Sequence, residues 1–285
     1  MLENSRNILI ASILVGLIAG ISLTVMLPSN TPYSIANTGP TGLSKLAVYL
    51  KAEPIRTGIG SIPDNPRESA VIIIQQGQPS PIAVKTIHKF AVDGGLVIVS
   101  GDYYFINYLI RYENLTVSVT NYPIYDPIIN AGDRYHPILI GTNCSQDVIG
   151  YKPLQLTPSG GLEVVARTSM YSYADENLNG YLDLTENISS YVVGVKAPLG
   201  RGYLIVLTSP ASFTNQYIDN NIAFIKCLVE GRNVYIDQSQ QSNNILEVLK
   251  ISLKYGPAGI LRTSIIMLSI ISGVISYIII RKYYK

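Results

Sequence analysis

A twelve-residue segment of this chain, Asp175–Glu186, carries oxygen-bearing side chains at the spacing of a calcium-binding loop. It fits the pattern D-x-[DN]-x-[DN]-G-x5-E at every specified position. Calcium is a hard cation that takes about six to eight oxygen ligands, and such a loop supplies them within one tight turn. We expect Gly180 to take the sharp bend and Leu182 to point inward. The candidate ligands are the side chains of Asp175, Asn177, Asn179, Asp183 and Glu186 and the backbone carbonyl of Tyr181.

The same segment has a second interpretation, as a turn without a metal. Asn and Asp side chains cap their own backbone, and glycine takes positive φ, so such sequences also form turns for local reasons. Residues 164–169 and 190–195 on either side are rich in β-branched residues, which are typical of strands and not of the helices of an EF-hand. We therefore expect a calcium-binding loop inserted between strands, where calcium holds the structure together. The metal-free turn is the alternative.

A serine nucleophile is the other chemistry that the sequence allows. A serine hydrolase built from alternating strands and helices can place its nucleophile on a tight turn after a buried strand, beside a histidine base. Ser100 has this position after Leu96–Val99, although no G-x-S-x-G surrounds it. Its conceivable partners are His136 with Asp102 or Asp126. No zinc or nucleotide-binding motif is present. The sequence favours a protein without catalytic residues, and a degenerate or unrecognised Ser hydrolase is the alternative.

Alternating strands and helices surround these candidate sites. Continuous apolar runs predict buried strands at 69–75 and 96–99, and the segment between them predicts a helix at 81–92. Strand, helix and strand joined by short loops indicate a parallel sheet. Further helices are expected at 41–51, 215–230 and 243–254, strands at 137–141, 203–207 and 234–236, and a strand-rich block at 162–195. The predicted fold is α/β, with a mainly parallel sheet and a β-rich insertion that carries the calcium loop.

Two long apolar segments lie near the ends of the chain. Residues 8–27 hold no charge across 20 residues, and a second apolar segment runs through 260–280. Each is long enough for a transmembrane helix. We expect the first to be an uncleaved anchor, with a cleaved signal peptide as the alternative. Basic residues at both ends predict cytoplasmic tails at 1–7 and 281–285. The central domain, 28–258, is then extracytoplasmic in a two-pass protein of the cell membrane.

Three glycosylation sequons, two cysteines and a weak net charge complete the picture. The sequons lie at Asn114, Asn143 and Asn187, and they predict glycosylation sites on an external domain. Cys144 and Cys227 either pair in a disulfide or stay apart, with Cys227 packing as a small hydrophobe. The formal net charge is +2 and no basic cluster is present, so the composition gives no reason to expect nucleic acid as a partner.

Several short motifs between residues 33 and 236 resemble the domain of unknown function 4350 family. They are Asn37–Ser44, the Gly94-Gly95 pair with its following strand, Gly200–Pro210, Phe213–Asn215 and Asp219–Phe224. The resemblance implies a flavodoxin-like fold, similar to class I glutamine amidotransferase domains. After the last strand the chain has Asp237-Gln238-Ser239 where the family's pattern has an acidic-histidine motif.

The resemblance also implies a biological setting. Members are often membrane proteins found beside MoxR-type AAA+ ATPases, which suggests assembly or maturation of envelope proteins. We therefore expect a non-catalytic, membrane-anchored binding or scaffold domain that is stabilised by calcium. Its expected partners are the membrane and other envelope proteins, within a system that includes a MoxR-type ATPase.

Overall fold

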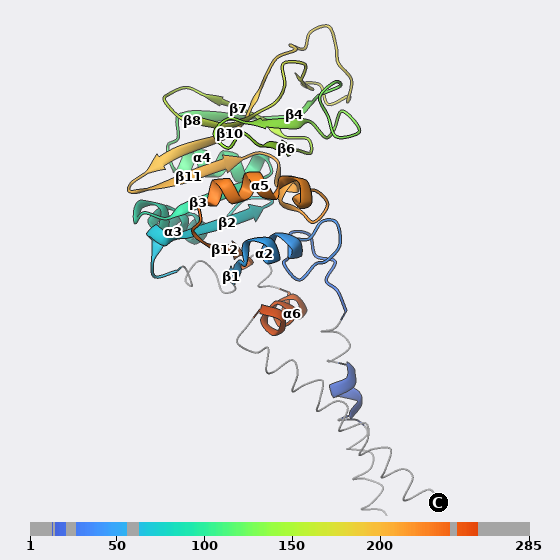
Figure 1. The fold of residues 1–285 in the computed structure, drawn as a ribbon, viewed down its shortest axis with the longest axis vertical. Helices are drawn as coiled ribbons and strands as arrows, with labels where there is room; N and C mark the ends of the chain where they lie inside the picture. The colour runs from blue at the N-terminus through green and yellow to red at the C-terminus, as the bar shows by residue number, and fades with distance from the viewer. Residues whose placement is uncertain (1–12, 14, 21–26, 56–62, 240–243, 256–285) are drawn as a thin grey trace, which may run out of the picture. The chain divides into compact units, whose positions relative to one another are not determined.

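The computed structural model describes residues 13, 15–20, 27–55, 63–239 and 244–255 (Figure 1). The chain divides into two compact units, Asn30–Ser242 and a second unit made of Met1–Ser29 with Asn243–Lys285. In the second unit, helix α6 (Ile245–Tyr255) begins with Asn244 Oδ1 accepting the backbone N–H of Glu247. The Ser29 hydroxyl donates to the carboxylate of the same glutamate at 2.6 Å. The described strands all belong to the first unit.

Five neighbouring strands of the first unit run parallel. Their order in the sheet is β1 (Glu53–Ile55), β12 (Asn233–Asp237), β2 (Ser69–Gln75), β3 (Leu96–Gly101) and β11 (Gly202–Leu207). β2 and β3 pair from Ala70↔Leu96 to Gln75↔Gly101. Residues of β2 and β3 are buried almost without interruption, because helices cover both faces of this part of the sheet.

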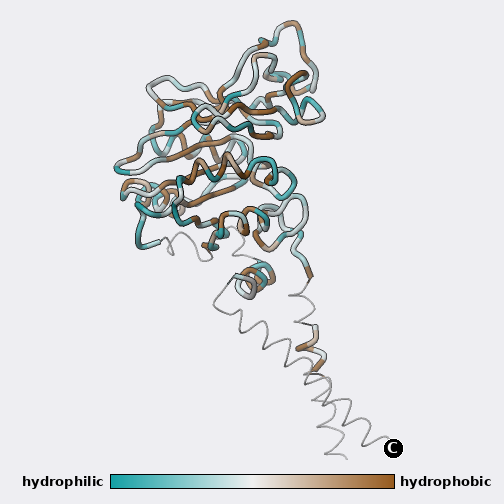
Figure 2. The backbone as a smooth tube through the Cα atoms, viewed as in Figure 1, coloured by the Kyte–Doolittle hydropathy of each residue, from teal (hydrophilic) through white to brown (hydrophobic). Residues whose placement is uncertain are grey.

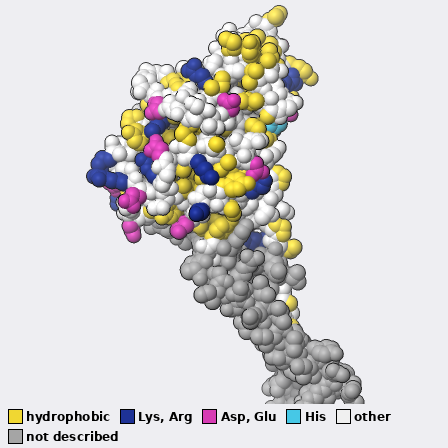
Figure 3. All heavy atoms as spheres, viewed as in Figure 1, with side chains coloured by type: hydrophobic (Ala, Val, Ile, Leu, Met, Phe, Trp, Pro, Cys, Tyr) yellow, Lys and Arg dark blue, Asp and Glu magenta, His cyan; other side chains and the backbone are white. Residues whose placement is uncertain are grey.

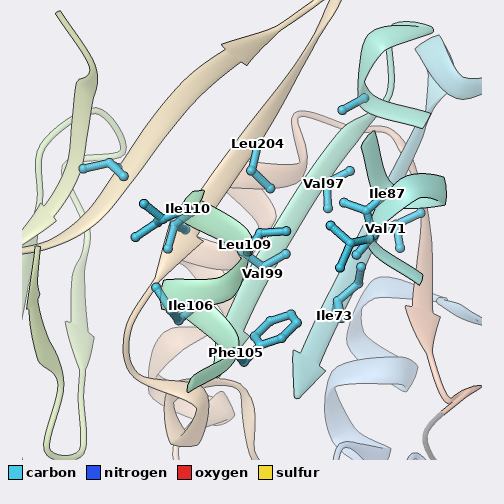
Figure 4. Packing of buried hydrophobic residues seen from close by; sticks show 14 of the residues in the cluster. Val71, Ile73, Ile87, Val97, Val99, Phe105, Ile106, Leu109, Ile110 and Leu204 are labelled. Carbon is cyan, nitrogen blue, oxygen red and sulfur yellow. The ribbon is translucent and has the colours of Figure 1, made fainter. Parts of the chain in front are cut away.

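Helices α3 (Pro81–Val92) and α4 (Tyr103–Tyr112) cover one face, and α2 (Ser44–Leu50) and α5 (Ile218–Val229) lie on the other (Figure 1). Alternate residues of each strand point to opposite faces. Figure 4 shows Val99 of β3 beside Leu109 of α4, and Val97 of the same strand beside Ile87 of α3. Each such fully buried side chain stabilises the fold by roughly 1.5–3 kcal/mol. Figure 2 shows the strands of this region as predominantly hydrophobic, with more polar loops around them.

The remaining strands extend the same sheet in antiparallel fashion. β10 (Val192–Leu199) pairs with β11 over six positions, from Gly194↔Leu207 to Leu199↔Gly202. Beyond it come β7 (Leu154–Pro158), β4 (Val117–Tyr125) and β9 (Tyr173–Ala174). β8 (Glu163–Arg167) also pairs with β10. On its other side β8 pairs with β5 (Ile138–Gly141), which forms a hairpin with β6 (Asp147–Ile149). Short 3-10 helices occur at η2 (Pro66–Glu68) and η3 (Pro210–Phe213).

Within the described residues the sheet is therefore mixed, with 12 strands in one connected network, and the expected flavodoxin-like, mainly parallel architecture is wrong. The strand–helix–strand pattern at 69–99 is correct, but the prediction extended it to the whole chain. The block at 162–195 is not an insertion beside the sheet, because β8 and β10 are members of it. A β-bulge at Gly194 lets β10 contact both β7 and β8, and a Cβ there would come within 2.6 Å of a Leu207 side-chain atom.

The two flanking transmembrane helices and the two-pass membrane localisation are likewise corrected. Across the part of the chain that the structure describes, no helix combines the length and the apolar character needed to cross a membrane. The expected span at 260–280 lies outside the described residues. So do residues 8–12, 14 and 21–26 of the expected span at 8–27.

Candidate metal-binding loop and its apolar surface

The loop predicted to bind calcium starts directly from the sheet. β9 pairs with Ile124 and Tyr125 of β4, and Asp175 follows β9 with its N–H donating to the carbonyl of Pro123 at 3.0 Å. Past the far end of the loop, Ile188 forms a bridge with Tyr173. The segments that flank the loop are thus extended and not helical, as expected from their β-branched residues. This loop is not an EF-hand.

Its first and last acidic residues close it by hydrogen bonds. The Asp175 carboxylate accepts the backbone N–H groups of Asn179 at 3.1 Å and Gly180 at 2.8 Å. The Glu186 carboxylate accepts those of Glu176 at 3.0 Å and Asp183 at 3.1 Å. Asp175 is only 1% exposed and Glu186 only 8%. Because two nearly buried carboxylates each accept two backbone N–H groups of the loop, the ends of the loop are fixed.

The polar side chains in the middle converge on Asp183. Its Oδ2 accepts the side-chain amides of Asn177 at 2.6 Å and Asn179 at 2.7 Å. The Asn179 Oδ1 accepts the N–H of Tyr181 at 2.7 Å. Gly180 has φ +79°, as the sharp bend requires. Five of the six candidate ligand residues are thus linked to one another by hydrogen bonds from their side chains, while Tyr181 joins only through its N–H.

These side chains suit calcium in type and order, yet the arrangement shown is one of hydrogen bonds. Across the described ranges, no group of three or more His, Cys, Asp or Glu side chains is gathered closely enough to hold a metal ion. The carboxylates are engaged by N–H donors instead. Each carboxylate has about four acceptor sites, so oxygen ligands remain available after these bonds are counted. Leu182, expected to point inward, is 43% exposed.

An aromatic cluster lies beside the loop. The rings of Tyr135 and Tyr173 both meet Tyr125 edge-on, with centroids 5.0 and 5.7 Å away. Burial, together with the charge of nearby Asp175, raises the pKa of Tyr125 to about 12. Arg134 stacks over the ring of Tyr181 at 4.7 Å and donates to the Tyr135 hydroxyl at 3.1 Å. This cluster gives the loop a rigid base.

Large apolar side chains are exposed around the same loop, and we call them the apolar end. Its members, with exposed fractions from 43% to 107%, are Met170, Tyr171, Leu178, Tyr181, Leu182, Leu184 and Ile188. Figure 3 shows hydrophobic side chains gathered at this end of the molecule. Residues 168–190 contain four acidic residues and no Lys or Arg. The prediction from sequence missed this surface, although Leu178, Leu182 and Leu184 occupy positions that no calcium ligand needs.

The candidate catalytic residues have other hydrogen-bond partners. The Ser100 hydroxyl is buried and donates to the Leu207 carbonyl of the neighbouring strand at 2.7 Å. Asp102 caps α4 by accepting the N–H of Phe105, and it accepts the N–H of Gly77 as well. The serine therefore has a backbone partner where a nucleophile needs a base.

The remaining members of the supposed triad have other partners. Asp126 is buried and accepts the hydroxyls of Ser169 at 2.5 Å and Ser172 at 3.0 Å. The His136 Nδ1 lies 2.7 Å from an Asp133 carboxylate oxygen, and its ring packs against those of Tyr151 and Tyr217. None of these contacts joins the serine, the histidine and an aspartate.

The sequons and cysteines also have defined places. Asn114, Asn143 and Asn187 are all exposed, and nothing in the structure tests whether they are modified. Cys144, in the β5–β6 hairpin, forms a disulfide with Cys227 of α5, with their Cα atoms 5.9 Å apart. The alternative that Cys227 packs as an unpaired hydrophobe is therefore wrong.

Comparison with known proteins gives one informative match. Residues 35–229 match the family described as "Domain of unknown function (DUF4350)", close to the 33–236 expected from the motifs. No curated protein matches the chain.

Solved structures give only distant likenesses. The "mmIFT52 N-terminal domain" shares 16% identity over 56% of this chain and 77% of its own, with a TM-score of 0.42. "Cytoplasmic Protein STM3548 from Salmonella typhimurium" shares 13% over 73% of this chain and 77% of its own, at 0.34. A β-galactosidase from Bacillus circulans sp. alkalophilus shares 14% over 57% of this chain and 23% of its own, also at 0.34. All three TM-scores are below 0.5, too low to support an inference about function.

Proposed function

We propose that this chain, which belongs to the domain of unknown function 4350 family, is a non-catalytic binding module whose calcium-stabilised loop presents an apolar surface to a protein partner. The observation that supports this most strongly is the apolar end itself, because soluble proteins rarely leave such a group of large apolar side chains uncovered without a binding role. The loop that displays it is closed at both ends by buried carboxylates.

Calcium would stabilise the loop by neutralising its carboxylates. The oxygen donors are those of Asp175, Asp183 and Glu186, the side-chain amides of Asn177 and Asn179, and the carbonyl of Tyr181. With three carboxylates in a loop between strands, we expect a modest dissociation constant, on the order of 10⁻⁴–10⁻³ M, as in extracellular modules. The metal would restrict the segment that carries Leu178, Leu182 and Leu184.

Charge indicates the kind of partner. Glu176 is exposed and lies outside the proposed ligand set, so it keeps its negative charge when calcium binds, and Arg134 over Tyr181 offsets part of it. We propose that this remaining negative charge favours a partner segment that alternates apolar and basic residues. The family resemblance implies envelope proteins as partners, in a system with a MoxR-type ATPase. We propose that the apolar end is the surface that binds such a partner.

Calorimetric titration of the full chain with calcium chloride tests the metal. We expect saturable heat below a few millimolar, lost in the variant Glu186→Gln because a bidentate ligand is removed. Glu176→Gln is the matched control, since Glu176 lies at a non-ligand position and contributes only its backbone N–H to the closure of the loop. Absence of heat up to millimolar calcium in the unmodified chain would show that the loop is a metal-free turn.

Peptide binding tests the surface. The chain contains no tryptophan, so the fluorescence of a Leu/Lys peptide carrying one Trp reports on the peptide alone. We expect binding that Leu178→Ser with Leu184→Ser weakens at least tenfold, and little binding of a Leu/Glu peptide of equal length. Ile82→Ser is the matched control, because Ile82 is 79% exposed on α3 and outside the apolar end. Equal loss in the control, or equal binding of both peptides, would refute recognition by this surface.

A further inference from the structure

The loop of residues 175–186 contains the single Asn-Gly pair of the sequence, Asn179-Gly180. In such a pair the backbone nitrogen of the glycine can attack the carbon of the asparagine side-chain amide, because glycine has no side chain that would screen this nitrogen. Asn179 is exposed and Gly180 is half-exposed, so water reaches both residues. The pair therefore has the residue types for a reaction of the chain with itself.

The side chain of Asn179 is folded back toward this nitrogen. Its Oδ1 accepts the backbone N–H of Tyr181, two residues further on, at 2.7 Å. Such a hydrogen bond closes an Asx turn, in which the amide carbon of the asparagine lies next to the nitrogen of the following residue. The folded loop thus holds the two reacting atoms together and removes much of the entropy cost of the attack. The Tyr181 N–H also points at the oxygen on which negative charge develops.

The Gly180 nitrogen has a base in contact with its proton. Its N–H donates to Asp175 Oδ2 at 2.8 Å, within the distance that proton transfer requires. Asp175 is only 1% exposed, and its Oδ1 accepts the N–H of Asn179 at 3.1 Å, so the carboxylate is fixed in place. The nitrogen that would leave, Asn179 Nδ2, donates to Asp183 Oδ2 at 2.7 Å. A nucleophile, a base and a donor to the developing oxyanion are thus arranged around one side-chain amide.

We propose that the loop deamidates Asn179 to aspartate or isoaspartate by its own chemistry, with Asp175 as the base. Asp175 takes the proton of the Gly180 nitrogen while that nitrogen forms a bond to Asn179 Cγ. The bond from Cγ to Nδ2 breaks, and the nitrogen leaves as ammonia with the proton that Asp175 returns through solvent. Water then opens the cyclic imide at one of its two carbonyls. One water is consumed and one ammonia is released, and no oxidant or reductant takes part.

The conversion adds a negative charge to the loop. Its effect on the metal rests on the proposed function, whereas the conversion itself requires no calcium. An aspartate in place of Asn179 is a fourth carboxylate among the candidate ligands, and calcium affinity depends on the number of charged ligands. Bound calcium would occupy both Asp175 and Asn179, so it should slow the conversion. The site therefore gains its additional charge before the metal fills it.

Peptide mapping by mass spectrometry tests the conversion in the full chain, incubated without calcium at pH 6, 7 and 8. A synthetic peptide of residues 172–189 gives the rate without the folded loop. We expect the chain to convert Asn179 about tenfold faster than the peptide, or more. The ratio of the two rates should be largest at pH 6, because the carboxylate replaces the hydroxide that the peptide needs.

Asn177 is the internal control in the same digests. Its Oδ1 also closes an Asx turn, on the N–H of Asn179 at 3.0 Å, but the side chain of Leu178 screens the nitrogen that would attack. We expect no acceleration of its conversion relative to the peptide. A chain that converts Asn179 no faster than the peptide would overturn the proposal, and so would a rate ratio that stays the same at all three pH values.

Two variants separate the base from the closure of the loop. Asp175→Asn removes the carboxylate beside Gly180, and the rate should fall to that of the peptide. Glu186→Gln is the matched control, since Glu186 closes the same loop through the N–H groups of Glu176 and Asp183. This variant should keep the accelerated rate. An equal loss in both variants would overturn the role of Asp175 as the base.

Calorimetric titration with calcium chloride tests the effect on the metal. We expect Asn179→Asp to bind calcium about threefold more tightly than the freshly prepared unmodified chain, or better. If both bind with equal affinity, the effect on the metal is refuted. If neither binds calcium, the proposed function fails, while the rates measured without calcium still decide the deamidation.

Discussion

Replacing His88 with alanine tests whether a buried carboxylate depends on one surface imidazole. Glu113, at the C-terminal end of α4, has a side chain fully shielded from solvent, whereas the His88 side chain on α3 is 45% exposed. The His88 Nδ1 lies 2.7 Å from the Glu113 Oε2. Among the described residues, Oε1 of the same carboxylate has no hydrogen-bond partner. The imidazole therefore provides the polar contact of this carboxylate.

The structure sets the expected magnitude between two limits. Removing one partner of a fully buried pair costs about 3–5 kcal/mol, and an exposed pair contributes about 0–1 kcal/mol. Because the imidazole is half exposed, water can replace part of what His88 supplies. We expect His88→Ala to lower the free energy of unfolding by about 1.5–3 kcal/mol, the range of a hydrogen bond to a charged group. In a Glu113→Leu background the same change should cost about 0.5 kcal/mol or less, because no buried charge remains.

Urea unfolding followed by circular dichroism gives the coupling energy of this double-mutant cycle. His136 and Asp133 provide a matched cycle, since their contact is also 2.7 Å long but the Asp133 side chain is 51% exposed. We expect a coupling energy below about 1 kcal/mol for that exposed pair. If the coupling between His88 and Glu113 is no larger, then burial of the carboxylate does not strengthen the contact, and the reasoning is wrong.

Three further predictions concern burial, close approach and covalent linkage. Burial raises the pKa of Asp237, so the folded state is destabilised at any pH where this carboxyl is charged. In thermal unfolding from pH 4 to 8, Asp237→Asn should be more stable than the unmodified chain above the pKa of the folded state, and the advantage should vanish as the pH falls to the ordinary pKa of an aspartate. A difference that stays constant with pH would contradict this. At Gly202 a Cβ would lie 2.1 Å from a backbone carbonyl oxygen, whereas at Gly161 a Cβ would have nothing within 4 Å. Gly202→Ala should therefore lower the free energy of unfolding in urea by about 1–3 kcal/mol or more, and Gly161→Ala by much less. Equal losses for the two variants would contradict this. The disulfide closes a loop of 83 residues. Replacing both Cys144 and Cys227 with serine should lower the free energy of unfolding in the same assay by up to about 4.5 kcal/mol, because the unfolded chain gains conformational freedom. An unchanged free energy of unfolding would contradict this.

Local patterns predicted the elements whose signals are local. β2 and α3 begin and end at the residues that their apolar patterns predicted, 69–75 and 81–92. Helix α4 was missed, although Asp102 is a good N-cap and Phe105, Ile106, Leu109 and Ile110 form a buried helical face. The sequence prediction gave only a turn at residues 100–102.

Long-range pairing could not be predicted in the same way. β4 and β7 pair across about 40 residues, and whether such segments meet depends on side-chain packing across the sheet and not on the propensity of either segment. The disulfide has the same difficulty, since a sequence separation of 83 says nothing about the distance between two Cβ atoms. The calcium motif fixed which side chains the loop contains, and the structure added that Asp175 and Glu186 are nearly buried and close it.

The two halves of the sheet differ in how their strands are held, and this difference predicts the order in which they open. β2 and β3 pair at six positions, whereas β7 meets β10 at one and β5 meets β8 at two. Segments with fewer ladder bonds open at lower free energy. The disulfide and the loop closed by Asp175 and Glu186 both fasten such segments, so their loss should act there first. In native hydrogen exchange we expect calcium chelation to raise exchange at residues 173–188 and reduction to raise it at 138–149, with β2 and β3 unchanged in both. Exchange that rises equally in β2 and β3 would show that the sheet opens as one unit, and that the two fastenings stabilise the whole fold instead of its antiparallel half.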